Sequence, residues 1–138
     1  MRLLQIKNGG FSLVECFGNV IPPYAILSHT WGNDNDELSF RDLVDGRGHD
    51  KTGWNKIEFC GKKATEDGIE YFWIDTCCID KSSSNELGEA INSMFHWYQD
   101  AAICYVNLSD VSVRDSPESS KSTWADQFRD SRWFTRGW

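Results

Sequence analysis

The sequence predicts an α/β domain of three layers, in which a mostly parallel sheet lies between helices and follows an N-terminal β-hairpin. Short continuous apolar runs, typical of buried strands, alternate with segments whose apolar residues recur every three or four positions, as in helices. The resulting order of strand, helix, strand, helix, strand is typical of right-handed parallel crossovers. A length of 138 residues suits one domain spanning residues 1–138.

The hairpin is expected in residues 1–17 and the α/β core in residues 23–109. In the first segment, two apolar-rich runs flank Asn8-Gly9-Gly10, and because these residues readily adopt positive φ the pattern favours a β-hairpin. After the break at Pro22-Pro23, the apolar run from Tyr24 to Leu27 indicates a central strand buried on both faces.

The first helix of the core is expected to start at Trp54. Residues 33–53 before it are polar and acidic apart from a small apolar cluster, so they predict a loop with one helical turn near Phe40 and Leu43. Gly68 is suited to ending the helix. One helical face is formed by Trp54, Ile57, Cys60 and Ala64.

A second buried strand is predicted at YFWID, residues 71–75, and a third in AAICYVNL from about Ala102. Between them, Ser83 and Glu86 have the spacing of a capping box, which supports a helix start. The apolar positions of that helix are Leu87, Ile91, Met94, Phe95 and Tyr98.

The C-terminal part divides into an exposed loop over residues 110–122 and the start of a helical block over residues 123–138. The loop is rich in serine and charge and contains Pro117. Trp124 and Phe128 then resume helical spacing. The chain finishes on SRWFTRGW, and because large apolar rings normally pack inside a fold, we expect this block to be truncated.

Composition narrows the classes of function. The net charge is −7 and the positive side chains are scattered, which argues against nucleic acid and anionic membranes as partners. No apolar run is long enough to span a bilayer, and no signal peptide is recognisable. The five cysteines are odd in number and mostly lie in apolar segments, a pattern typical of free thiols in a reducing compartment. We therefore expect a soluble cytoplasmic protein.

Two segments place polar groups at the carboxyl ends of predicted strands, where ligands of parallel sheets usually bind. The first is Ser28-His29-Thr30-Trp31-Gly32 and the second is the run from Asp75 to Asp80. His29 could donate or accept a proton, or could only organise its loop by a backbone hydrogen bond. Trp31 could stack on a base or a nicotinamide ring, or could pack in the core, and Gly32 suits a turn with positive φ.

The acidic and sulfur-containing candidates also have two interpretations each. Asp75 and Asp80 could bind sugar hydroxyls or a metal, or could form turns and cap the next helix. Cys77 could form a Cys–His nucleophile with His29, although buried thiols explain Cys77-Cys78 more simply. Glu86 is a pocket candidate whose simpler role is to stabilise the first turn of a helix. No glycine-rich phosphate-binding loop is present.

Three sequence blocks resemble the fungal heterokaryon incompatibility (HET) domain in order and spacing. They are PPYAILSHTWG, GIEYFWIDTCCIDKSSSNELGEAINSMFHWYQDA and SRWFTRGW, which together reach across most of the chain. The N-terminal MRLLQI hairpin is similar to that of HET domains at the head of fungal STAND-type (NLR-like) proteins.

The resemblance implies a cytoplasmic domain that triggers programmed cell death when genetically unlike fungal cells fuse. It also implies a remote relation to TIR domains of innate immunity, which have a flavodoxin-like parallel sheet. Some TIR domains cleave NAD with a glutamate in a Trp-Cys-x-x-Glu-Leu helix, and others act only by assembly. HET domains commonly continue past Arg-Gly-Trp with a Thr-Leu-Gln-Glu-Leu-like run, so the resemblance places the corresponding glutamate just beyond Trp138.

Three hypotheses follow. In the first, the complete domain hydrolyses NAD or a related nucleotide as substrate, holds no bound cofactor, and is nearly inactive when it ends at Trp138. In the second, the domain is a non-enzymatic module that kills by self-association and by recruiting other domains of a larger incompatibility protein, with surface aromatics such as Trp97 as contacts. The third and weakest hypothesis is a metal site formed by His29 with Asp75 or Cys77. Because it is the weakest, we expect that the domain binds no metal.

Overall fold

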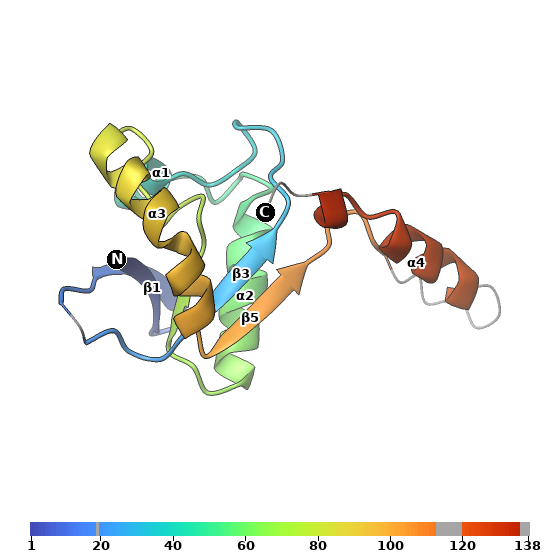
Figure 1. Cartoon of the computed structure of the whole chain (residues 1–138), viewed down its shortest axis with the longest axis horizontal. Coiled ribbons are helices and arrows are strands. Elements are labelled where there is room, and N and C mark those ends of the chain that lie inside the picture. The colour runs from blue at the N-terminus through green and yellow to red at the C-terminus, as the bar shows by residue number, and fades with distance from the viewer. Residues whose placement is uncertain (19, 113–119, 136–138) are drawn as a thin grey trace.

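The computed structural model describes residues 1–18, 20–112 and 120–135, and Figure 1 shows how its elements are arranged. The strands are β1 (Arg2–Lys7), β2 (Gly10–Glu15), β3 (Tyr24–His29), β4 (Tyr71–Trp73) and β5 (Ile103–Asn107). The helices are α1 (Phe40–Val44), α2 (Trp54–Glu66), α3 (Ser84–Asp100), α4 (Ser120–Arg129) and the short 3-10 helix η1 (Arg132–Thr135). The fold class is therefore α/β, as the alternating pattern predicted.

The five strands form one mixed sheet in the order β2-β1-β4-β3-β5. β3 runs parallel to both β4 and β5, whereas β1 is antiparallel to both β2 and β4. The prediction of a mostly parallel sheet was wrong in this respect, because the hairpin extends the sheet instead of lying outside it. Leu3 and Leu4 of β1 are fully buried, and burying them against β4 explains why the hairpin joins the sheet.

The predicted hairpin is present, and its two-residue turn explains it. Asn8 and Gly9 have φ values of 53° and 76°, so both central residues of the turn are left-handed, as the tight turns of hairpins require. Lys7 then pairs with Gly10, and Leu4 faces Leu13 on β2. On its other side Leu4 pairs with Phe72, which joins the hairpin to the core.

The predicted central strand is β3, in which all six residues are buried. It lies between two parallel strands, so both of its faces contribute to the hydrophobic core. The largest fully buried side chains near it include Phe72 and Trp73 of β4.

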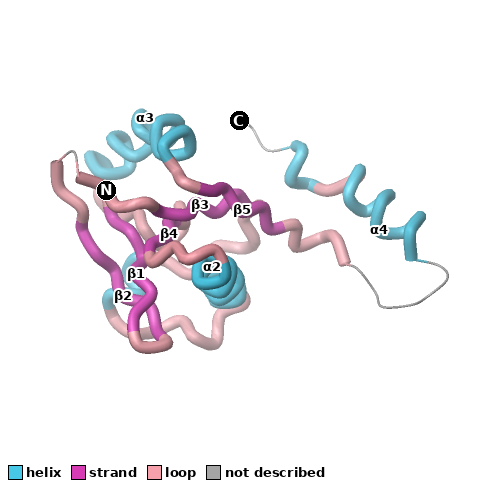
Figure 2. The backbone as a smooth tube through the Cα atoms, turned by 90° about the horizontal axis from the view of Figure 1, so that it is seen from below, coloured by secondary structure: helices cyan, strands magenta, loops and turns pink. Residues whose placement is uncertain are grey.

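The helices α2 and α3 lie on opposite sides of the sheet (Figure 2). α2 buries Ile57, Cys60 and Ala64, as its spacing predicted. It ends at Glu66, and Gly68, two residues further on, has a φ of 72°. The amide of Gly68 donates to Thr65 and that of Ile69 donates to Ala64, the two bonds of a Schellman motif.

The buried face of α3 matches the prediction only in part: Leu87, Met94 and Tyr98 pack against the core, as expected, but two other predicted residues do not. Ile91 and Phe95 are 63% and 69% exposed, while Ala90 is buried and Trp97 packs against the core with its ring 5.5 Å from that of Trp73. The helix carries more apolar residues than one face can bury, and spacing alone did not show which ones face the sheet. The assembly hypothesis assumed that Trp97 is a surface contact, but its side chain is partly buried and packs against the core.

The second parallel strand is shorter than predicted, because β4 ends at Trp73 and not at Asp75. The carbonyl of Ile74 accepts hydrogen bonds from the amides of Cys77 and Cys78, at 3.4 Å and 2.9 Å. These bonds turn the chain away from the sheet, so Asp75 lies in a turn.

The C-terminal helix α4 starts at Ser120, three residues earlier than predicted, and projects away from the body of the domain (Figures 1 and 2). Pro117 of the predicted loop, and Arg136 to Trp138 of the final block, lie outside the described residues. In the described part of the chain, no helix has both the length and the apolar character needed to cross a membrane.

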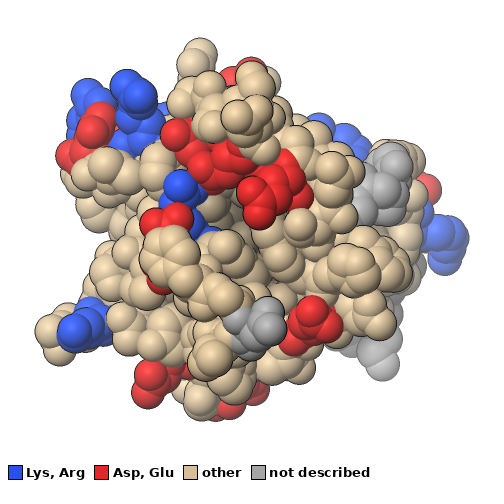
Figure 3. Space-filling view, turned by 60° about the vertical axis from the view of Figure 1, so that its left-hand side comes forward, with Lys and Arg blue, Asp and Glu red and all other residues tan. Residues whose placement is uncertain are grey.

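Charge on the face shown in Figure 3 is unevenly distributed. The largest charged patch there is acidic, and Lys and Arg side chains occur in small separate groups. This face therefore presents no continuous basic surface.

Candidate functional site

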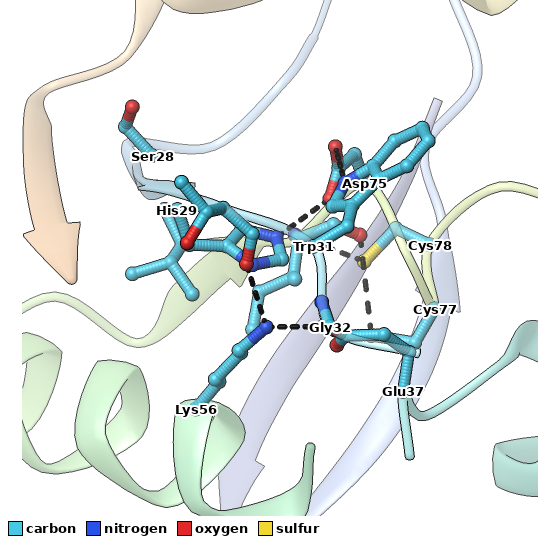
Figure 4. A network of polar contacts seen from close by, with 12 residues as sticks. Ser28, His29, Trp31, Gly32, Glu37, Lys56, Asp75, Cys77 and Cys78 are labelled. Carbon is cyan, nitrogen blue, oxygen red and sulfur yellow. Dashed lines mark hydrogen bonds and ion pairs between the residues drawn. The ribbon is translucent and has the colours of Figure 1, made fainter. Parts of the chain in front are cut away.

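Three of the predicted pocket residues form one hydrogen-bonded group between the ends of β3 and β4. The Nε2 of His29 lies 2.8 Å from Oδ1 of Asp75, and the indole Nε1 of Trp31 donates to Oδ2 of the same carboxylate at 2.9 Å (Figure 4). Both carboxylate oxygens therefore have a ring partner. The turn after β4 is held in this way to the chain that leaves β3.

The electrostatics of this group favour an ionised Asp75. Burial, the largest single influence, raises the pKa of its carboxyl, but the hydrogen bond and charge of His29, the bond from Trp31 and the charge of Lys81 together outweigh it. The pKa of Asp75 is therefore lowered. The Nζ of Lys81 also lies 4.2 Å from the centre of the Trp31 ring, a cation–π contact.

Burial gives His29 and Asp75 a structural role in this conformation. The two residues are only 1% and 3% exposed, whereas Trp31 is 56% exposed. The imidazole organises its loop, as one of the two interpretations of the sequence held, although its partner is a carboxylate and not a backbone carbonyl. The second nitrogen, Nδ1, is buried and has no hydrogen-bond partner among the described residues.

Two other candidates are also bonded inside the protein. Ser28 is 7% exposed, and its Oγ accepts a hydrogen bond from the indole of Trp133 at 3.0 Å. Cys77 is fully buried and its Sγ lies 3.9 Å from the carbonyl oxygen of Ile74. Its contact with the Cys78 thiol, together with burial, raises the pKa of Cys77 well above that of an ordinary thiol. A thiolate at neutral pH is thus disfavoured, and His29 bonds to Asp75 in place of Cys77.

Asp80 and Glu86 belong to a separate cluster around Arg2. The guanidinium of Arg2 binds both oxygens of Glu86, with Nη2 to Oε2 at 3.0 Å, and the amide of Asp80 donates to Glu86 at 2.8 Å. Ser83 caps α3 by accepting from the Glu86 amide, but the Glu86 side chain does not return the bond. The capping-box spacing thus marked the helix start, while the carboxylate ties α3 to the hairpin.

A cavity of about 400 Å³ opens beside the carboxyl ends of β3 and β5. After β3 the chain continues to β4, which lies on one side of β3, and it then returns to β5, which lies on the other side. The direction in which successive strands are added to the sheet therefore reverses between β3 and β5. Ligands of open α/β sheets usually bind at such a switch point. Of the predicted residues, Thr30 and Gly32 line this cavity; the remaining lining residues are Asn33, Asp36, Glu37, Thr52, Gly53, Asn55, Lys56, Asn107, Ser109 and Arg132.

Glu37 is the most unusual group in this cavity. It is only 9% exposed, and its Oε1 accepts from the amide of Gly32 at 2.6 Å and pairs with the ammonium of Lys56. The same ammonium donates to the carbonyl of Thr30 at 3.0 Å, so one lysine of α2 holds the loop after β3 at two points (Figure 4). The other oxygen, Oε2, is buried and has no hydrogen-bond partner among the described residues.

Glu37, Lys56 and Arg132 line the cavity although no sequence pattern indicated them. Glu37 lies in an acidic stretch that was assigned to a loop, where a single carboxylate has no distinguishing pattern. Its neighbour Leu38 is the one signal, because an isolated apolar residue among polar ones indicates an anchor, and Leu38 is 1% exposed. An anchored loop buries the residues beside the anchor as well.

No group of three or more His, Cys, Asp or Glu side chains in the described ranges is arranged to hold a metal ion. The hypothesised pair of His29 and Asp75 does exist, but as a direct hydrogen bond.

Comparison with known proteins gives two matches. The family model described as "Heterokaryon incompatibility protein (HET)" matches residues 24–118, which is more than half of the chain. The curated "Vegetative incompatibility protein HET-E-1" of Podospora anserina is 59% identical over 140 residues, an alignment that covers 100% of this chain and 10% of that protein. The chain thus spans about a tenth of the length of this relative. No solved structure matched the chain.

Proposed function

Because the chain belongs to the heterokaryon incompatibility (HET) family, we propose that it is a cell-death effector domain that acts in the cytoplasm during vegetative incompatibility. The 59% identity to a vegetative incompatibility protein supports a role in this process. That relative is much longer, so we further propose that the domain works together with other domains of a larger, NLR-like protein.

The reaction that we propose for the domain is TIR-like hydrolysis of NAD or a related nucleotide. Two features support a TIR-like, three-layer core. The parallel strands have the order β4-β3-β5, which in chain order is second-first-third, as at the start of the flavodoxin-like arrangement. Helices α2 and α3 lie on the two sides of the sheet.

The chemistry is a substitution at C1′ of the ribose attached to nicotinamide. The bond between C1′ and the nicotinamide nitrogen breaks, and its electron pair returns to the ring, which leaves as neutral nicotinamide. A water oxygen bonds to C1′ and gives up a proton to solvent. Positive charge develops on the ribose in the transition state, so nearby carboxylates lower its energy.

The observation that carries this proposal is the cavity at the switch point with the carboxylate of Glu37 in its wall. The cavity has the size of a small-molecule site. It also combines a buried acceptor with amide and hydroxyl groups, as recognition of a nucleotide requires.

Release of nicotinamide from NAD tests the proposal. The purified 138-residue chain and a form that extends past Trp138 should be compared, each with and without forced self-association. We expect turnover by the longer, self-associated form. If that form releases no nicotinamide while it kills cells on expression, the domain does not act through this hydrolysis.

A second candidate function is a non-enzymatic module that acts by homotypic assembly. The observation that favours it is the exposed pair Ile91 and Phe95, one helical turn apart on α3. Under this hypothesis Phe95→Ser should abolish killing, whereas Phe17→Ser, at another exposed aromatic, should not. Alanine substitution of His29 or Asp75 does not discriminate between the two functions, because both residues are buried and their loss would destabilise the domain under either hypothesis.

A further inference from the structure

The two oxygens of the Glu37 carboxylate are in unequal surroundings. Oε1 receives the Gly32 amide and the Lys56 ammonium, while Oε2 receives no donor from any described residue although it is buried. A buried carboxylate oxygen normally has a hydrogen-bond donor, and leaving it without one is costly. Oε2 is therefore an acceptor that lacks a donor in this conformation.

The wall of the 400 Å³ cavity indicates what kind of donor would fit. Its charged residues are two acids, Asp36 and Glu37, and two bases, Lys56 and Arg132, so their formal charges cancel. The remaining polar side chains are hydroxyls and amides, namely Thr30, Thr52, Ser109, Asn33, Asn55 and Asn107. A wall of this kind suits a neutral ring with several hydroxyl groups better than it suits a phosphate.

We propose that this cavity binds the ribose ring of a nucleotide and that Oε2 of Glu37 accepts a hydrogen bond from one of the ribose hydroxyls. The inference rests on the proposed nucleotide hydrolysis and names the sugar subsite within it. Glu37 is a substrate-binding residue in this scheme and transfers no proton. Its hydrogen bond to the 2′-hydroxyl strengthens as positive charge develops on the sugar.

The arrangement around Oε1 keeps the carboxylate in the correct orientation. Lys56 and the Gly32 amide are both donors, so they bind the acceptor oxygen and direct Oε2 away from themselves. In Glu37→Gln the amide oxygen would take the place of Oε1 for the same reason. The NH₂ group would then occupy the place of Oε2 and replace an acceptor by a donor.

Titration calorimetry with the 138-residue chain tests the proposal, with ADP and 2′,3′-dideoxy-ADP as probes. These probes share base and phosphates and differ only in the ribose hydroxyls. We expect ADP to bind at least tenfold more tightly than the dideoxy compound. Glu37→Gln should reduce the affinity for ADP to that for the dideoxy compound and leave the latter unchanged, whereas Glu66→Gln, an exposed control on α2, should change neither.

Three results would overturn the proposal. They are equal affinity of the unaltered chain for the two probes, an equal loss of affinity for both probes in Glu37→Gln, and no binding of ADP. Thermal unfolding of each variant shows whether it is folded. Should Glu37→Gln not fold, the comparison of the two probes on the unaltered chain decides alone. The proposed hydrolysis is tested separately by nicotinamide release: hydroxyl-dependent binding without hydrolysis would reject the reaction and retain the subsite, and the reverse result would reject only the subsite.

Discussion

The imidazole of His29 and the carboxylate of Asp75 lie 2.8 Å apart, and their side chains are only 1% and 4% exposed. They come from the ends of neighbouring parallel strands, 46 residues apart in the chain. The pair therefore joins the loop after β3 to the turn after β4. The same loop carries Gly32 and Glu37, so the pair also supports one wall of the candidate cavity.

Replacing Asp75 should destabilise the domain strongly. In Asp75→Asn one NH₂ group must face either the His29 ring or the Trp31 indole, both of which are donors in the present structure. A buried unsatisfied polar group and the loss of hydrogen bonds to a carboxylate together should lower the free energy of unfolding by roughly 2–3 kcal/mol. Urea unfolding measures this loss. The exposed control Asp50→Asn should stay within about 0.5 kcal/mol of the unaltered chain.

The same carboxylate should make stability depend on pH. The folded pKa of Asp75 is lowered, so its stabilising contribution is complete above the unfolded value of about 3.9 and is lost as pH falls through the lower folded value. The difference in free energy of unfolding between the unaltered chain and Asp75→Asn should therefore shrink below about pH 4. Both proteins share the other acids with lowered pKa values, such as Asp42, so the difference isolates Asp75. A difference that is constant through acid pH would contradict the assignment.

The bond between Arg2 and Glu86 should contribute a smaller, salt-dependent stability. The two-point contact is partly buried, with the side chains 21% and 28% exposed, and it joins the hairpin to α3. Glu86→Gln should lower the free energy of unfolding by about 1 kcal/mol at low salt, and by less in 1 M NaCl, where charges are screened. Urea unfolding at the two salt concentrations checks this. Glu66→Gln, which breaks an exposed pair with Lys63, should have the smaller effect, and equal losses would count against the assignment.

Two glycines should respond to alanine in opposite directions. Gly68 has a φ of 72° in the motif that ends α2, so Gly68→Ala forces a left-handed conformation and should destabilise the domain by about 1 kcal/mol. Gly88 lies inside α3, and a Cβ there would meet no atom within 4 Å. Gly88→Ala should therefore stabilise the domain by roughly 0.5–1 kcal/mol. Chemical denaturation of the two variants in parallel tests both signs.

The sequence predicted those parts of the fold that depend on local patterns. The hairpin follows from the two residues at its turn, and β3 follows from its unbroken apolar run. Two features depend on contacts between distant segments and could not be predicted in this way: the insertion of β1 beside β4, and the face that α3 turns to the sheet. The alternation of elements along the chain left both undecided.

The candidate site was predicted in outline for a similar reason. Parallel strands bring their carboxyl ends together, so the association of His29 and Asp75 followed from the topology. Burial depends on how loops fold back over those ends, and it separates these residues from Thr30 and Gly32, which line the cavity. Glu37 reaches the site because Leu38 anchors its loop and Gly53 packs against it, and neither contact leaves a pattern in the sequence.

The packing of Gly53 leads to a last prediction, in which a small substitution should displace Glu37. Gly53 has φ −60° and ψ −22°, values that any residue adopts, so alanine would suffer no backbone strain there. A Cβ, however, would lie 2.7 Å from the carbonyl oxygen of Asp36, 2.8 Å from the amide nitrogen of Leu38 and 2.9 Å from the Cα of Glu37. These are backbone atoms, which cannot move aside as a flexible side chain can.

Gly53→Ala should consequently lower the free energy of unfolding by about 1–3 kcal/mol, the usual cost of overpacking. It should also shift the backbone amide resonances of residues 32–38 in nitrogen-15 NMR spectra and weaken ADP binding, because the loop and its carboxylate move together. Gly10→Ala is the matched control, since its new Cβ would make only an ordinary 3.8 Å contact with the carbonyl of Lys7. If Gly53→Ala is as stable as the control and leaves the amide resonances of the loop in place, Gly53 does not hold Glu37 at the cavity wall.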